Sequence, residues 1–164
     1  MNNSFPRITK ILISGFIGFT LSGAALATMS DADILAQEAR EQENLNKAVR
    51  CMEILEVELD VDRFGEECIA EGHIEHNPRV PDGKEGLLRY FAAQLERFPQ
   101  MHADIKRAGA DGDLVWMHIH FKARPDAKGN AGMHIFRMEN GKFAEHWGVG
   151  QPVVESTLHD NSMF

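Results

Sequence analysis

The sequence predicts a single α+β domain in which helices come first and an antiparallel sheet follows. Apolar residues recur at helical spacing up to about residue 98, and from there on they alternate with polar residues. Two tight-turn dipeptides, Asp111-Gly112 and Asn140-Gly141, separate segments of this alternating kind. At 164 residues, 43% of them hydrophobic and 26% charged, the chain is long enough to bury one core and too apolar for a disordered protein.

Three helices are expected in the first part of the chain. The first begins at Ser30, where Ser30 and Asp33 resemble a capping box, and runs to about Leu59. A short second helix covers residues 62–69, and an extended segment over 73–77 ends at Pro78. A third helix is capped by Asp82 and Glu85 and stops before Pro99.

Four strands are expected next, over residues 101–109, 114–123, 131–138 and 143–150. If Glu139 pairs with Lys142 across the Asn140-Gly141 turn, His134 lies opposite Trp147, and His146 lies on the other face of the sheet. A slip of one residue would reverse this assignment.

The N-terminus has the pattern of a secretory signal. Arg7 and Lys10 precede an uncharged, largely apolar run, which contains the small-residue cleavage motif Ala25-Leu26-Ala27. We therefore expect a signal peptide over 1–27, a leader or helix start over 28–43, and the folded domain over 44–164, in a periplasmic or secreted protein without a membrane anchor after cleavage. A retained membrane anchor is the alternative.

The cysteine content raises the question of a disulfide, and the net charge limits the class of binding partner. An oxidising compartment would permit a disulfide between Cys51 and Cys68, and two buried free thiols are the alternative that we favour. The formal charge of −8 argues against nucleic acid as a partner.

Several ordered motifs resemble the SnoaL-like polyketide cyclase family of the nuclear transport factor 2-like superfamily, which includes ketosteroid isomerases. The resemblance covers about residues 44–164 and is carried by His76-Asn77-Pro78-Arg79-Val80-Pro81-Asp82-Gly83, 110–115, Ile135-Phe136-Arg137, 139–142 and Glu145-His146-Trp147. It implies a curved sheet wrapped against three helices to form a cone with a deep pocket. It also implies chemistry without a cofactor, in which a carboxylate removes a proton next to a carbonyl group.

Transferred residue by residue, the resemblance shows that two acidic positions of the family are lost, at His134 and at Gly148, where relatives often have Asp. The pocket histidine of the family matches His120, whereas its catalytic acid matches His134. His120 and His134 are therefore the candidate catalytic residues. Asn77 matches a position that carries a base in isomerase relatives and is expected to face inward. The other expected binding residues are Trp116, His118, Phe136 and Trp147.

Three functions are compatible with these residues. His134 could act as the base in aldol condensation or isomerisation, with His120 as donor or orienting group. The domain could instead bind a small apolar or carbonyl-containing ligand without changing it. A metal site formed by His118, His120 and His134, with Glu145 as a further ligand, is the third possibility.

A homodimer is also expected, because one face of the predicted sheet is too apolar for water. That face carries Val115, Met117, Ile119, Phe121, Met133 and Ile135, with His146 near the interface.

Overall fold

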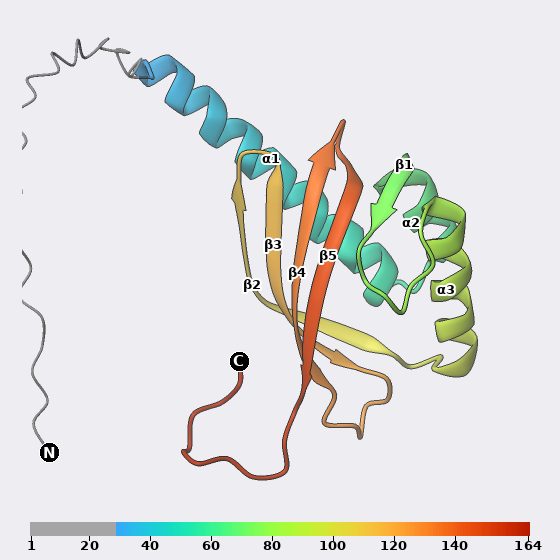
Figure 1. The fold of residues 1–164 in the computed structure, drawn as a ribbon. Helices are drawn as coiled ribbons and strands as arrows, with labels where there is room; N and C mark the ends of the chain where they lie inside the picture. The colour runs from blue at the N-terminus through green and yellow to red at the C-terminus, as the bar shows by residue number, and fades with distance from the viewer. Residues whose placement is uncertain (1–28) are drawn as a thin grey trace, which may run out of the picture.

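The computed structural model describes residues 29–164, in which helices pack on one face of a five-stranded sheet (Figure 1). The elements in chain order are α1 (Asp31–Glu56), α2 (Val61–Cys68), β1 (Ile69–Glu75), α3 (Lys84–Arg97), β2 (His102–Asp111), β3 (Leu114–Lys122), β4 (Asn130–Glu139) and β5 (Lys142–Pro152). The predicted α+β class is confirmed. The predicted signal segment lies outside the described residues. Within 29–164, no helix is both long and apolar enough to cross a membrane.

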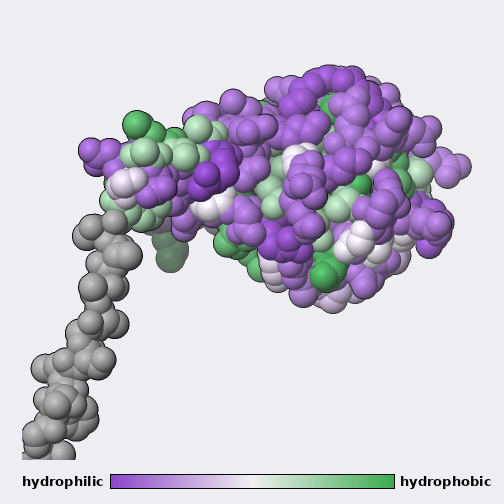
Figure 2. All heavy atoms as spheres, turned by 90° about the horizontal axis from the view of Figure 1, so that it is seen from above, coloured by the Kyte–Doolittle hydropathy of each residue, from purple (hydrophilic) through white to green (hydrophobic). Residues whose placement is uncertain are grey.

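Helix α1 begins at the predicted cap and reaches past the sheet. The Ser30 side chain accepts a hydrogen bond from the Asp33 backbone, and the Asp33 carboxylate accepts one from the Ser30 backbone. The N-terminal turns of α1 project from the body of the molecule, whose surface in this view is mainly hydrophilic (Figure 2). The C-terminal half packs on the sheet, with Ala48, Cys51, Met52, Ile54 and Leu55 buried.

Helix α3 is not capped as predicted. Its N-cap is Gly83, which has a positive φ of 79° and provides no side-chain hydrogen bond. Asp82 accepts a hydrogen bond from the Glu75 backbone instead, at 2.9 Å. This bond ties the loop before α3 to the end of β1 and helps to hold Glu75 in place.

The sheet has the strand order β1-β5-β4-β3-β2. Strands β2 to β5 form the predicted antiparallel meander, and β1 adds a parallel edge strand beside β5. We call the helix-covered face of this mixed sheet the inner face and the opposite face the outer face.

A β-bulge in β5 overturns the predicted register of the last hairpin. Glu139 pairs with Lys142 as expected, and Met138 pairs with Phe143, but the next pair is Arg137 with Glu145. Ala144 is therefore an extra residue, and it shifts all later pairs by one. His134 lies opposite Gly148 rather than Trp147, so the placement of Trp147 inward and His146 outward is wrong.

The predicted faces of β3 are also exchanged. Val115, Met117 and Ile119 are buried in the core on the inner face, so they do not form the expected exposed interface. Trp116, His118 and His120 lie on the outer face, where they pair with Ile135, Met133 and Ala131. Alternation could not decide between these faces, because both contain large apolar or aromatic side chains.

Cys51 and Cys68 form a disulfide, so the preference for free thiols is wrong. Their Cα atoms are 5.7 Å apart, within the normal range for a disulfide. The bond joins α1 to the end of α2 within the buried core.

Candidate active site

A cavity of about 630 Å³ lies between the helices and the inner face of the sheet. Most of its wall is apolar, because the core side chains of both layers contribute to it. The apolar lining includes Met52, Leu55, Phe64, Leu87, Phe91, Phe121, Phe136 and Phe143. Seven ionisable side chains also line it: Glu56, His73, Glu75, Arg79, Tyr90, His134 and His146.

Three of these ionisable side chains form an unbroken hydrogen-bonded chain across β1, β5 and β4. Glu75 accepts from His146 Nδ1 at 2.8 Å and 2.9 Å through its two oxygens. His146 Nε2 lies 2.9 Å from His134 Nδ1. Because β1 is parallel to β5 and β5 is antiparallel to β4, the three residues are neighbours across adjacent strands.

The chemistry of the groups fixes where the protons lie in this chain. An ionised carboxylate only accepts hydrogen bonds, so the Nδ1 of His146 must be the donor to Glu75. With His146 neutral, its Nε2 carries no proton and accepts from the Nδ1 of His134. The lone pair of His134 is then on Nε2, which makes no hydrogen bond to any described residue.

The pKa shifts agree with this arrangement. Burial alone raises the pKa of Glu75, but the hydrogen bond from His146 and the proximity of His73 outweigh burial and hold it at about 2. Burial and the neighbouring His146 lower the pKa of His134 to about 4, and the negative charge of Glu75 offsets only part of this. At neutral pH, Glu75 is therefore ionised and His134 is neutral.

His73 lies beside the same carboxylate on the edge strand. Its Nδ1 donates to the Phe143 carbonyl at 3.0 Å, because a carbonyl oxygen only accepts. Its Nε2 lies 3.8 Å from Glu75 Oε2, and both side chains are 1% exposed. Glu75 is thus enclosed by two histidines and by the Asn77 backbone, which donates to it at 2.7 Å.

Glycines opposite the histidine rings make room for them. A Cβ atom at Gly148 would lie 3.2 Å from both His134 Nδ1 and His146 Nε2, the two atoms of the central hydrogen bond. A Cβ atom at Gly132 would lie 2.9 Å from His134 Nε2. Both distances are shorter than ordinary contacts, so side chains at these positions would displace the rings.

The inner cavity contains three of the residues expected from the sequence. His134, Phe136 and Asn77 line it. The ring of His134 is stacked with the rings of Phe136 and His146, whose centroids lie 6.2 Å and 5.1 Å from its own.

The other expected site residues lie on the outer face, away from His134. His120 contacts the Lys128 carbonyl at 2.7 Å and stacks on Phe164, and His118 stacks on the same ring. Trp147 stacks on His76, with centroids 4.9 Å apart. Trp116 is 38% exposed. The expectation that these residues share a face with His134 is wrong.

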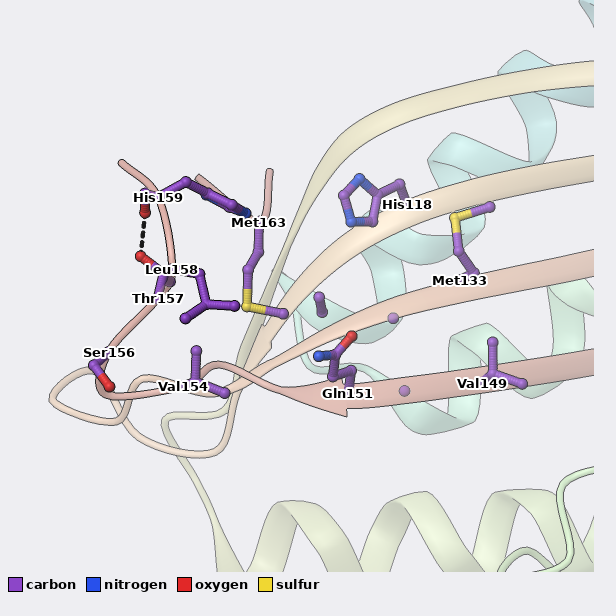
Figure 3. A pocket seen from close by; sticks show the side chains of 13 residues that line it. His118, Met133, Val149, Gln151, Val154, Ser156, Thr157, Leu158, His159 and Met163 are labelled. Atoms are coloured by element: carbon purple, nitrogen blue, oxygen red, sulfur yellow. Dashed lines mark hydrogen bonds between the residues drawn. The ribbon is translucent and has the colours of Figure 1, made fainter. Parts of the chain in front are cut away.

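A second cavity, of about 750 Å³, lies on the outer face beneath the C-terminal segment. Figure 3 shows His118 and Met133 of the sheet beside Leu158 and Met163 of that segment. Its lining is mostly aliphatic, and His118 and His159 are its titratable side chains. It offers no hydrogen-bonded acid–base pair comparable to that of the inner cavity.

The predicted metal ligands are not brought together. His118 and His120 lie on the outer face, whereas His134 lies on the inner face. Among residues 29–164, no cluster of three or more His, Cys, Asp or Glu side chains has the arrangement of a metal site.

The model of the SnoaL-like domain family matches residues 48–146, which is more than half of the chain. The chain belongs to the SnoaL-like domain family. No curated protein matches. The match lies within the domain predicted over 44–164.

Solved structures show the same fold as this SnoaL-like protein. An uncharacterised cystatin-fold protein from Novosphingobium aromaticivorans is 28% identical, with a TM-score of 0.57, over 65% of this chain and 97% of that one. A proposed polyketide cyclase from Bacillus cereus is 20% identical, with a TM-score of 0.57, over 74% and 78%. A proposed ketosteroid isomerase from Kribbella flavida is 14% identical, with a TM-score of 0.59, over 74% and 91%.

Sequence reasoning missed six ionisable residues of the SnoaL-like cavity: Glu56, His73, Glu75, Arg79, Tyr90 and His146. A signal was present for three of them. His73 and Glu75 lie four and two residues before the expected inward residue Asn77, which places them on the same face of an extended segment. Glu56 lies four residues after Met52 on the apolar stripe of α1. His146 had no such signal, because the bulge that turns it inward comes from an ordinary alanine.

Proposed function

We propose that this protein binds a small, mainly apolar carbonyl compound in the inner cavity and removes a proton from the carbon next to the carbonyl. His134 acts as the base through Nε2. The observation that carries the proposal is the hydrogen-bonded chain from Glu75 through His146 to His134.

The hydrogen-bonded chain of side chains lets the positive charge move from His134 to His146. When Nε2 of His134 takes the proton, the C–H electron pair stays on the ligand as an enolate. The Nδ1 proton of His134 then passes to Nε2 of His146. The positive charge rests on His146, whose Nδ1 is 2.8 Å from the Glu75 carboxylate. His134 alone is a weak base at a pKa of about 4, and this second transfer moves the charge to a place where it is stabilised.

The proposal agrees with the reactions named for structural relatives. The Bacillus cereus and Kribbella flavida proteins carry the names polyketide cyclase and ketosteroid isomerase. Isomerisation of this kind begins with removal of a proton next to a carbonyl. The apolar walls would exclude water and strengthen the interactions of the charged groups.

Hydrogen–deuterium exchange at the α-carbon of 2-tetralone tests the proposal. This apolar ketone is small enough for a cavity of about 630 Å³, and proton NMR in D₂O follows the exchange. We expect the protein to accelerate exchange and His134→Gln to reduce kcat/KM by roughly 100-fold or more, because it removes the base.

His159→Gln is the matched control, because His159 is exposed on the C-terminal segment. It should exchange 2-tetralone at the wild-type rate. Exchange no faster than in buffer, or wild-type exchange by His134→Gln, would contradict the proposal.

A ligand-binding protein without catalysis is the second candidate, and the low pKa of His134 favours it. Such a protein would bind 2-tetralone, seen as shifts of its NMR signals, while the α-hydrogens exchange at the buffer rate. The same experiment therefore separates the two functions.

We also propose that the protein is exported. The cationic and then apolar N-terminal sequence supports this, and so does the Cys51–Cys68 disulfide, because disulfides persist in oxidising compartments. The mass of the protein recovered from the periplasm tests it. Full-length chain in the cytoplasm with two free thiols would contradict it.

A second copy of this chain is the proposed protein partner. The outer face supports this proposal, because it exposes large apolar side chains next to one another on β3 and β4. These are Trp116, Met133 and Ile135.

A further inference from the structure

Glu56 is a buried carboxyl group that the proposed proton transfer does not use. It lies at the C-terminal end of α1, is 6% exposed, and lines the inner cavity. Its Oε2 atom has no hydrogen-bond partner. Among the described residues, the two buried side-chain polar atoms without partners are Glu56 Oε2 and His73 Nε2, and both residues line this cavity.

An unsatisfied buried carboxyl group works against folding, and a leucine at this position would fit the stripe of Met52 and Leu55. Buried polar groups without partners are rare in native proteins. A ligand that fills the cavity would complete the hydrogen bonding of Glu56.

Below its raised pKa, Glu56 can donate a hydrogen bond. Burial raises its pKa to about 7, and the positive charge of His102 opposes this only partly. His102 is itself paired with Asp104 at 2.8 Å. The neutral acid has an O–H group, which an ionised carboxylate lacks.

Glu56 and His134 are separate polar centres of one cavity. Glu56 belongs to the helical wall and His134 to the sheet wall. His146 and Glu75 are the neighbours that shift the pKa of His134, whereas His102 is the neighbour that acts on the pKa of Glu56. A ligand that spans the cavity meets both centres.

We propose that the Glu56 carboxyl group binds a second oxygen atom of the ligand, so that the cavity selects a mainly apolar carbonyl compound with a further hydroxyl or carbonyl group. The inference rests on the proposed function for the carbonyl end of the ligand. It assigns Glu56 as a specificity-determining residue.

Calorimetry tests this inference. It compares the binding of 2-tetralone with that of its four hydroxylated derivatives, which carry one hydroxyl group at ring position 5, 6, 7 or 8. In the wild type, at least one hydroxylated derivative should bind about tenfold more tightly than 2-tetralone, as one added hydrogen bond to a buried group predicts. Glu56→Leu should remove this preference and leave the affinity for 2-tetralone within about threefold of the wild type. Glu56→Gln, which can still donate and accept, should keep part of it.

Equal binding of 2-tetralone and all four hydroxylated derivatives by the wild type would overturn the inference. A preference for a hydroxylated derivative that survives Glu56→Leu would also overturn it. Circular dichroism checks the fold of the variant, and Glu56→Met replaces it if Glu56→Leu does not fold. Binding is measured without turnover, so a failure of α-hydrogen exchange refutes the catalytic proposal alone. Absence of any discrimination by the wild type, with α-hydrogen exchange intact, refutes this inference alone.

Discussion

Two carboxyl groups that line the same cavity have opposite pKa shifts. The pKa of Glu75 is about 2 and that of Glu56 is about 7, although both side chains are buried. Burial raises the pKa of each, so their partners make the difference: Glu75 receives hydrogen bonds from His146 and the Asn77 backbone, whereas Glu56 Oε2 receives none. Groups whose environments separate their pKa values in this way take different roles in a site.

The raised pKa of Glu56 predicts a pH-dependent stability. The unfolded chain has a Glu56 pKa near 4.5, so the folded state binds this proton more tightly. The stability contributed by Glu56 is fully present below about pH 4.5 and is lost as pH rises through 7. The unfolding free energy of Glu56→Gln, minus that of the wild type, should therefore increase by up to roughly 3 kcal/mol from pH 4.5 to 7.5.

Urea unfolding at the two pH values measures this difference. Glu43→Gln is the control, because Glu43 is exposed on the same helix. A difference that is the same at both pH values would show that Glu56 does not hold its proton in the folded state.

At the scale of the elements, strand β5 makes room for the rings of His134 and His146, because Gly148 has no side chain. Gly148→Ala would place a methyl group 3.2 Å from both atoms of the His134–His146 hydrogen bond. We expect α-hydrogen exchange of 2-tetralone to fall by at least about tenfold, because small displacements of catalytic groups have large effects.

Gly72→Ala in β1 is the matched control, since nothing lies within 4 Å of a Cβ atom there. It should keep the wild-type exchange rate. If Gly148→Ala also kept it, the central hydrogen bond would not be needed for proton transfer.

The helices and strands were predictable from the sequence, but the face of the sheet to which each side chain points was not. Helical spacing located α1 to α3, and the Asn140-Gly141 turn located the last hairpin with the correct first pair, Glu139 and Lys142. The outer positions of β3 contain Trp116 and two histidines, which alternation alone does not distinguish from a pocket wall. The bulge at Ala144 has no signature, because alanine fits regular and bulged strands alike.

At the scale of the whole molecule, the outer face predicts assembly. Ile135 is 39% exposed at the centre of the apolar residues of β3 and β4. We expect a dimer in sedimentation analysis at micromolar concentration and a monomer for Ile135→Lys, because burying an unpaired ammonium group is costly.

Ala92→Lys is the control for the added charge, because Ala92 is exposed on α3. It should remain dimeric. A monomeric wild type, or a dimer of unchanged affinity for Ile135→Lys, would exclude this face as the interface.

The single extra residue in β5 also has an evolutionary consequence. Loss of Ala144 would make β5 regular but would keep the later pairs, because Glu145 would then follow Phe143 directly opposite Arg137, and His146 would stay on the inner face. The inward position that His146 occupies therefore lies three residues after Phe143 in this chain and would lie two residues after it in a strand without the bulge. In relatives without the bulge, we expect the inward residues to correspond only when the alignment has a gap at Ala144, because an ungapped alignment would match His146 to an outward residue.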